Sequence, residues 1–371
     1  MCAQVINLRL VTEGEVFMDI VALLTDAAAH GASDVFIIAG RPLSYKQDGK
    51  LLMENGDRLM TDDTELLIRG IYKMAGRDIT HFLSTGDDDF SFAVKGLSRF
   101  RVSTYRQRGS MAAVVRVITF SLPDPVDLGI PENIIHLADH TKGLVLVTGP
   151  AGSGKSTTLA CMIDYINTNM EKHIITLEDP LEYLHSHKKS IVSQREISTD
   201  TESYVNALRA SLRQTPDVIL LGEMRDYETM SIAMTAAETG HLVISTLHTL
   251  GAANTIDRII DVFPSNQQRQ VAVQLSMVLQ AVVSQQLLPG TGGKQLPAFE
   301  VMTVTPAIRN MIRENKIHQI DGVIYSSSNA NMKSMDSSLL ELYNAGQITG
   351  RTALTYATNP DLLEKKIGAQ R

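Results

Sequence analysis

A glycine-rich segment followed by a lysine and three hydroxyl residues carries the clearest chemistry in this sequence. GPAGSGKS fits the spacing G-x-x-x-x-G-K-[ST], directly after the apolar run LVLVT and directly before a helical pattern. Glycines let backbone N–H groups turn inward around phosphate oxygens, and a helix N-terminus adds partial positive charge. We therefore expect a phosphate-binding loop. Its residues are Gly149, Pro150, Ala151, Gly152, Ser153, Gly154, Lys155, Ser156 and Thr157.

Two residues of this loop have distinct expected roles. Lys155 can reach the β- and γ-phosphates of a nucleotide, and the Ser156 hydroxyl can coordinate Mg²⁺. A chance glycine turn is the alternative, but the flanking strand and helix patterns favour a nucleotide site. ATP and Mg²⁺ are therefore the expected ligands.

Polar residues also flank three later apolar runs. HIITLED ends in Glu178 and Asp179, DVILLGE ends in Glu223, and HLVISTLH begins with His241 and ends with His248. In a parallel α/β sheet, ligand-binding groups lie at the carboxyl ends of the strands. The three runs therefore predict catalytic groups beside the phosphate loop.

These groups suit metal binding, proton transfer and phosphate sensing. Glu223 ends its strand as a Walker B acid does and is expected to hold Mg²⁺ through water. Glu178 is the candidate to orient or deprotonate the attacking water, because a new loop, EDPLEYLH, begins there. The two glutamates could exchange these roles. His248 could contact the γ-phosphate and report its loss, and His241 is grouped with the catalytic candidates.

Two arginines are added because of the charge that develops during hydrolysis. A phosphate loop without a nearby arginine hydrolyses slowly, and another domain or subunit often supplies one. Arg101 and Arg116 lie in the last expected strands of the first domain. Solvated strand arginines are the alternative interpretation.

The first part of the chain has the pattern of a small α+β domain over residues 17–120, preceded by an extension over residues 1–16. A helix is expected over 17–29, then a strand in DVFIIAG and a tight hairpin at Asp48-Gly49. A second helix over 62–76 has Thr61 or Asp62 as its cap. Two or three antiparallel strands should follow over 88–118.

A proline-rich stretch separates this domain from a second one. Three prolines in TFSLPDPVDLGIP indicate a linker, placed at residues 121–135. Residues 136–371 alternate short apolar runs with helices, which indicates a mainly parallel sheet covered on both faces. From about Thr305 onward the pattern is helical. The expected fold class is α/β, with a small α+β domain first.

Composition limits the classes of protein that remain. The chain has 371 residues, 44% of them hydrophobic, and a formal charge of −7. No block of Lys and Arg stands out, so stable nucleic-acid binding is not expected. The only modest basic segment is SHKKS at 186–190, and a solvated turn is the simpler interpretation of it.

The cysteines and the N-terminus indicate the compartment. Cys2 and Cys161 make no zinc or disulfide framework. The start lacks the features of a signal peptide, and no long apolar run follows, so we expect a cytoplasmic protein.

Together these strings resemble the type IV pilus retraction ATPase (PilT) family of the type II/IV secretion ATPases. GPAGSGKSTT is similar to its Walker A motif, ITLEDPLEYLH to its aspartate box, DVILLGEMRD to its Walker B motif and TGHLVISTLHT to its histidine box. The resemblance covers nearly the whole chain. It implies a PAS-like N-terminal domain, a RecA-like P-loop ATPase domain, and a homohexamer with nucleotide between the domains. Arg101 and Arg116 match the arginines that the family supplies from its first domain, and Arg99 matches less closely.

The resemblance also implies a function. In this family ATP hydrolysis moves a ring that acts on an inner-membrane pilus platform protein and the pilin machinery, at the inner face of the cytoplasmic membrane. The chain lacks the tetracysteine zinc element and the large extra N-terminal domain of the extension and type II secretion ATPases, which favours retraction and twitching motility. An accessory retraction ATPase, or a conjugative or type IVB secretion motor, is an alternative. A RecA-type DNA translocase is an alternative from another class.

The segment PAIRNMIRENK, residues 306–316, resembles the part of the family that is tied to retraction. Thr305 should cap its helix and Pro306 should occupy the first turn. Ile308, Met311 and Ile312 share one apolar face. Arg309 and Arg313 are expected on an adjacent polar face. On that expectation, Arg309→Ala would leave folding and ATP hydrolysis intact and would affect only coupling to the pilus machine.

Overall fold

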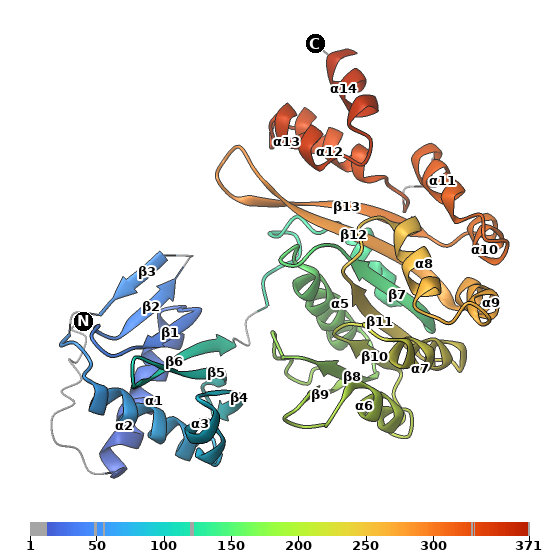
Figure 1. The fold of residues 1–371 in the computed structure, drawn as a ribbon. Helices are drawn as coiled ribbons and strands as arrows, with labels where there is room; N and C mark the ends of the chain where they lie inside the picture. Colours follow the sequence, from blue (N-terminus) through green and yellow to red (C-terminus); the bar gives the residue numbers. More distant parts are fainter. Residues whose placement is uncertain are drawn as a thin grey trace. The chain divides into compact units, whose positions relative to one another are not determined.

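The computed structural model describes residues 13–47, 50–54, 56–118, 122–327, 329 and 331–369, and the chain divides into two compact units (Figure 1). The first unit is Met1–Ser121 and the second is Leu122–Arg371. Most of the expected extension, residues 1–16, lies outside the described residues. Helix α1 nevertheless begins at Glu13 rather than at Phe17.

The first unit contains one six-stranded sheet in its described part, and helices pack on it. The strand order is β3-β2-β1-β6-β5-β4, and every neighbouring pair is antiparallel. Large apolar side chains such as Phe82 and Phe100 are fully buried in its core. The elements are α1 (Glu13–Ala29), β1 (Asp34–Ile37), β2 (Ser44–Gln47), β3 (Lys50–Met53), α2 (Thr61–Met74), α3 (Thr80–Thr85), β4 (Asp87–Val94), β5 (Ser98–Gln107) and β6 (Ser110–Ile118).

Local details of this unit differ from the sequence expectations in two places. Met60, and not Thr61 or Asp62, is the N-cap of α2, and its backbone N–H donates to the carboxylate of Asp63 at 2.7 Å. A carboxylate in the first turn satisfies a free N–H and suits the helix dipole, so a methionine is tolerated at the cap. The hairpin between β2 and β3 forms, while Asp48 and Gly49 lie outside the described residues.

The second unit is built on a sheet that is mostly parallel, as the alternation of apolar runs predicts. In the described part it has seven strands in the order β13-β12-β7-β11-β10-β8-β9, and only β13 runs antiparallel to its neighbour. Its first elements are α4 (Glu132–Ile135), η1 (His136–Asp139), β7 (Gly143–Thr148), α5 (Lys155–Asn169), β8 (His173–Glu178), β9 (Ile191–Glu196), α6 (Tyr204–Ser211) and β10 (Val218–Leu221). The sheet is completed by α7 (Tyr227–Glu238), β11 (Leu242–Leu247), α8 (Ala252–Asp261), α9 (Gln268–Val278), β12 (Leu279–Pro289) and β13 (Gln295–Thr303).

Alternate residues of the central strands enter two different cores. Leu144 and Leu146 of β7 pack with helices α6 to α10 on one face, whereas Val145 and Val147 pack with α4, η1 and α5 on the other. Because successive side chains of a strand point to opposite faces, a sheet covered on both faces needs apolar residues at every position. This requirement explains the unbroken apolar run before the phosphate loop.

The chain after residue 305 is helical, as expected. Its elements are α10 (Pro306–Arg313), η2 (Ile317–Gln319), α11 (Ile320–Ser326), α12 (Met335–Asn344), α13 (Gly350–Tyr356) and α14 (Pro360–Ala369). Helices α12 to α14 form a separate apolar cluster with Leu288 and Ala298 of the β12–β13 pair. Throughout the described ranges, no helix is both long enough and apolar enough to span a bilayer.

Helix α10 begins as the sequence predicts, but one of its arginines does not lie on a free polar face. Thr305 caps the helix by accepting from the N–H of Ile308, and Ile308 and Ile312 are fully buried. The Arg309 guanidinium donates to the carbonyls of Ser276 and Met277 at 2.6 and 2.9 Å. These carbonyls belong to the last turn of α9, where helical partners are missing. The expectation that Arg309 lies on a free polar face is therefore wrong, and its replacement should affect stability as well as coupling.

We expect Arg309→Ala to lower the free energy of unfolding by about 1–2 kcal/mol, because the C-terminus of α9 loses a charged hydrogen-bond donor. Urea unfolding followed by circular dichroism measures this change. Arg313→Ala is the matched control on the same helix, since Arg313 is exposed and its loss should cost less than about 0.5 kcal/mol. Equal losses for the two variants would contradict the capping role.

Candidate active site

A pocket of about 270 Å³ lies at the carboxyl ends of the parallel strands in the second unit. The phosphate loop forms one wall, and the segments that follow β8, β10 and β11 supply the polar groups opposite it. The sheet therefore brings Lys155, Ser156, Glu178, Glu223 and His248 together around one cavity. These five residues come from four segments that lie far apart in the sequence.

The phosphate loop is pressed against the neighbouring strand β12. A Cβ atom at Gly149 would lie 2.2 Å from the carbonyl oxygen of Gln285, so no other residue fits at this position. Gly154 has a φ of 87° immediately before α5, a conformation that favours glycine. The side-chain amide of Gln285 also accepts a hydrogen bond from the Thr158 hydroxyl at 2.8 Å. Gln285 thus supports the loop, although no motif in the sequence indicates it.

Lys155 lies inside the curve of the loop. Its ammonium donates to the carbonyls of Gly149 and Pro150 at 2.9 and 2.8 Å, and the side chain is buried. Burial lowers the pKa of Lys155, and the nearby carboxylates of Glu223 and Glu182 oppose that shift. A buried cation beside a glycine turn at a helix N-terminus fits the phosphates of a nucleotide.

Two residues of the EDPLEYLH string reach over the start of α5, and the sequence interpretation did not assign them a role. The Ser156 hydroxyl donates to Glu182 Oε1 at 2.8 Å, and the Thr157 and Tyr183 hydroxyls are 2.9 Å apart. Ser156 Oγ, Glu182 and Glu223 supply oxygen atoms, which are the donors that Mg²⁺ prefers. The residues present therefore fit a Mg²⁺ ion shared with nucleotide phosphates.

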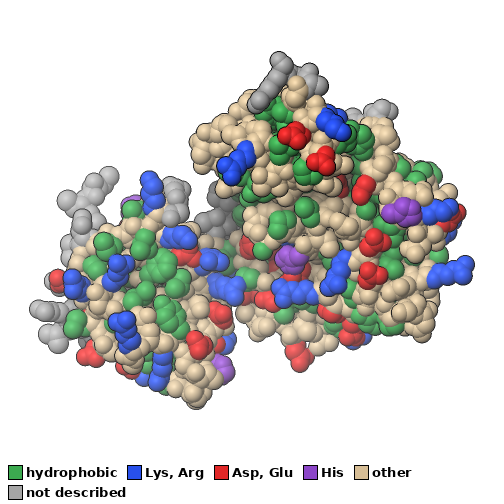
Figure 2. All heavy atoms as spheres, turned by 45° about the horizontal axis from the view of Figure 1, so that its top comes forward, with side chains coloured by type: hydrophobic (Ala, Val, Ile, Leu, Met, Phe, Trp, Pro, Cys, Tyr) green, Lys and Arg blue, Asp and Glu red, His purple; other side chains and the backbone are tan. Residues whose placement is uncertain are grey.

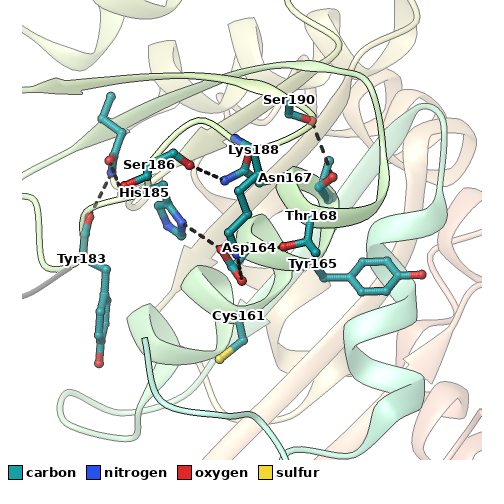
Figure 3. A network of polar contacts seen from close by, with 12 residues as sticks. Cys161, Asp164, Tyr165, Asn167, Thr168, Tyr183, His185, Ser186, Lys188 and Ser190 are labelled. Atoms are coloured by element: carbon teal, nitrogen blue, oxygen red, sulfur yellow. Dashed lines mark hydrogen bonds and ion pairs between the residues drawn. The ribbon is translucent and has the colours of Figure 1, made fainter. Parts of the chain in front are cut away.

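The loop that carries Glu182 is fastened to α5 by a network of polar contacts (Figure 3). Lys188 donates to both carboxylate oxygens of Asp164, at 2.8 and 2.9 Å, and to the Thr168 hydroxyl. The Asn167 amide donates to the carbonyl of Ser186 at 2.7 Å. This network fixes the loop beside the phosphate-binding helix. It also engages Lys188, a basic residue of the string that was considered for DNA contact.

Glu178 has the environment of a general base. The Thr176 hydroxyl donates to its carboxylate at 2.6 Å, and the Gln194 amide on β9 approaches the same oxygen at 3.5 Å. Burial raises the pKa of Glu178 to about 7, an effect that these two donors oppose. A carboxylate with a pKa near neutrality accepts a proton from water far more readily than an ordinary one.

Glu223 has a different environment, because both of its oxygens meet cationic or titratable groups. Oε1 lies 2.6 Å from Arg225 Nη2, and Oε2 lies 3.2 Å from His248 Nε2. Its side chain is only 14% exposed. This contrast favours Glu178 as the base and Glu223 as the metal-side acid, an assignment that remains a prediction.

The segment after His248 is held by the β12–β13 pair. The N–H of Gly251 donates to Ser284 Oγ at 2.9 Å, and the N–H of Ala252 donates to Glu300 Oε1 at 2.8 Å. Ser284 and Glu300 are direct partners across the two strands. Glu300 also accepts from the N–H of Met335 at the start of α12, so the histidine segment and the C-terminal helices share one buried anchor.

His241 does not line the pocket. It precedes β11, at the amino edge of the sheet, and its Nδ1 lies 3.0 Å from the carbonyl of Ala236. The six residues of β11 separate it from His248, a distance of roughly 20 Å along an extended strand. The two histidines of one string therefore lie at opposite edges, and the structure does not place His241 beside the phosphate loop.

The arginine candidates belong to the first unit. Arg101 and Arg116 are direct partners in the β5–β6 register, and Arg99 lies on the same face of β5 as Arg101. Arg116 Nε donates to Asp34 at 2.9 Å, and Arg101 lies 3.8 Å from Asp89. Like charges directly opposite each other on a sheet are destabilising. Asp34 and Asp89 offset this repulsion within the first unit.

Comparisons with known proteins agree with this architecture. Residues 10–319 match the sequence profile of the family described as "Type II/IV secretion system protein". The chain is 45% identical over 345 residues to "Type IV pilus retractation ATPase PilT" of Pseudomonas aeruginosa, covering 93% of this chain and 99% of that protein. It is 48% identical over 274 residues to "Twitching motility protein" of Neisseria gonorrhoeae, covering 74% and 73%. The solved structure "Crystal Structure of the Pilus Retraction Motor PilT and Bound ADP" is 46% identical, with a TM-score of 0.85 and coverage of 92% and 98%.

We expect Lys155→Ala to reduce steady-state ATP hydrolysis at least about 100-fold, because the loop loses its buried cation. Purified protein and a phosphate-release assay measure the rate. Lys189→Ala, which removes an exposed lysine away from the phosphate loop, is the control and should retain the wild-type rate. Near-normal hydrolysis by Lys155→Ala would overturn the site assignment.

The raised pKa of Glu178 predicts a pH dependence. The carboxyl group is protonated below its folded pKa of about 7 and cannot then accept a proton, so kcat should rise with pH up to about 7 and level off above it. Glu178→Gln should bind nucleotide but scarcely hydrolyse it, whereas Glu223→Gln should change the Mg²⁺ dependence as well. A flat wild-type profile between pH 6 and 8 would contradict the role of Glu178.

Proposed function

We propose that this chain, which belongs to the type II/IV secretion system protein family, is an ATPase motor that powers type IV pilus retraction. The observation that carries this proposal is the 45% identity to a pilus retraction ATPase over 99% of that protein's length. A match over 93% of this chain includes most of both units. The phosphate loop and the carboxylates around it supply the chemistry that such a motor needs.

The residues of the pocket divide the work of hydrolysis. Lys155 and the backbone of the loop hold the phosphates, and Ser156 and Glu223 would hold Mg²⁺, with Glu182 beside them. Mg²⁺ neutralises charge on the phosphate oxygens when it is bound. Glu178 accepts the proton of the attacking water, and Thr176 and Gln194 orient its carboxylate. His248 reports the loss of the γ-phosphate to the segment anchored on Ser284 and Glu300.

The motor that we propose is a homohexamer in the cytoplasm, at the inner face of the cytoplasmic membrane. It acts there on a platform protein and the pilin machinery. Arg101 and Arg116, which are direct partners on neighbouring strands, would neutralise developing phosphate charge.

Two other functions compete with this proposal. An accessory retraction ATPase, or a conjugative or type IVB secretion motor, would use the same residues. A DNA translocase has less support, because Lys188 is engaged with Asp164 and Thr168. On the face drawn in Figure 2, basic and acidic side chains are also intermixed over the second unit instead of forming a patch of one sign.

Deletion of the gene tests the function directly. Cells should carry many pili and should not move on surfaces, because pili extend without being withdrawn. The wild-type gene should restore motility, and the Lys155→Ala gene should not. Normal motility after deletion, or loss of pili, would contradict a retraction role; a partial loss of motility would indicate an accessory motor.

A further inference from the structure

Arg225 is a pocket residue that the sequence interpretation left without a role. It lies two positions after Glu223 in the string GEMRD, beyond the end of β10. Its guanidinium is 2.6 Å from Glu223, yet its side chain is 74% exposed. Among the described residues of the second unit that line the pocket, Arg225 is the only arginine.

We propose that Arg225 is a latch on Glu223: it gives way when Mg²⁺ binds, and the released guanidinium then contacts the nucleotide phosphates as an arginine from the same subunit. The inference rests on the proposed ATPase function. It differs from the supply of arginines by the first unit, because Arg225 belongs to the same unit as the phosphate loop.

Both carboxylate oxygens of Glu223 already have a partner. Arg225 contacts one carboxylate oxygen and His248 lies beside the other, so a metal ion and its water shell must compete with them. Arg225 and His248 are 74% and 54% exposed, and contacts of exposed ions are weak. A divalent cation can therefore displace the guanidinium at little cost.

The released guanidinium has an anionic partner to turn to in the same pocket. Arg225 lines the same cavity as Lys155 and Ser156, which would hold the nucleotide phosphates. The Asp179 carboxylate lines this cavity too and would compete with the phosphates for the guanidinium. A triphosphate carries more negative charge than one carboxylate, and the planar fork of arginine matches phosphate oxygens.

The latch predicts opposite effects on two measurements of one variant. Arg225→Gln removes the competitor for Glu223, so binding of a non-hydrolysable ATP analogue should reach half-saturation at several-fold lower Mg²⁺. The same variant lacks the phosphate contact, so kcat at saturating Mg²⁺ should fall at least about 10-fold. A residue with only a structural role would not shift these two quantities in opposite senses.

Two further variants complete the experiment. Arg209→Gln breaks a comparably exposed ion pair with Glu228 outside the pocket and should leave both measurements at the wild-type values. Arg225→Lys keeps the charge without the planar fork and should return the Mg²⁺ midpoint toward the wild-type value. Equal thermal unfolding midpoints exclude misfolding as the cause of any change.

An unchanged Mg²⁺ midpoint or an unchanged kcat in Arg225→Gln overturns the latch. Wild-type protein that shows no Mg²⁺-dependent nucleotide binding would instead overturn the proposed ATPase function. The two failures are therefore distinguishable in one set of titrations.

Discussion

A Cβ atom at position 149 would collide with the backbone carbonyl oxygen of Gln285, and the rest of the site depends on this close approach. The phosphate loop therefore packs directly against β12, immediately before α5 begins. The position of α5 in turn decides where Lys155 and Ser156 lie. Because Gln285 also bonds to Thr158, the strand supports both the turn and the first turn of the helix. The loop is thus held by backbone packing before any nucleotide contributes.

The two pocket glutamates show how one sheet edge can create two different acids. Glu178 meets neutral donors in a confined space, and its pKa rises toward neutrality. Glu223 meets an arginine and a histidine. Burial without a counter-charge favours the protonated form of a carboxyl group, as at Glu178. The two carboxylates therefore differ in their contacts, as the predicted division between a base and a metal-side acid requires.

The C-terminal region is tied to the site through backbone groups at helix ends. Glu300 accepts hydrogen bonds from the starts of α8 and α12, and Arg309 donates to the end of α9. In both cases a charged side chain satisfies groups that the helix itself leaves without partners. The segment after His248 and the helices beyond residue 305 are therefore parts of one framework. A displacement of that segment would act directly on the helices packed around β12 and β13.

The sequence alone determined the phosphate loop, the mainly parallel sheet and the order of the two domains, because glycine spacing and apolar runs express local requirements of the backbone. It also identified Glu178, Glu223 and His248, since polar residues that end apolar strands gather at one edge of a parallel sheet. Only the tertiary structure decided which groups face them. Glu182, Arg225 and Gln285 enter the site through loops and a strand whose positions no local pattern expresses. The positions of His241, away from the pocket, and of Arg309, against the end of α9, have the same origin: periodicity places a residue along its own element, whereas its partners are set by the elements packed around it.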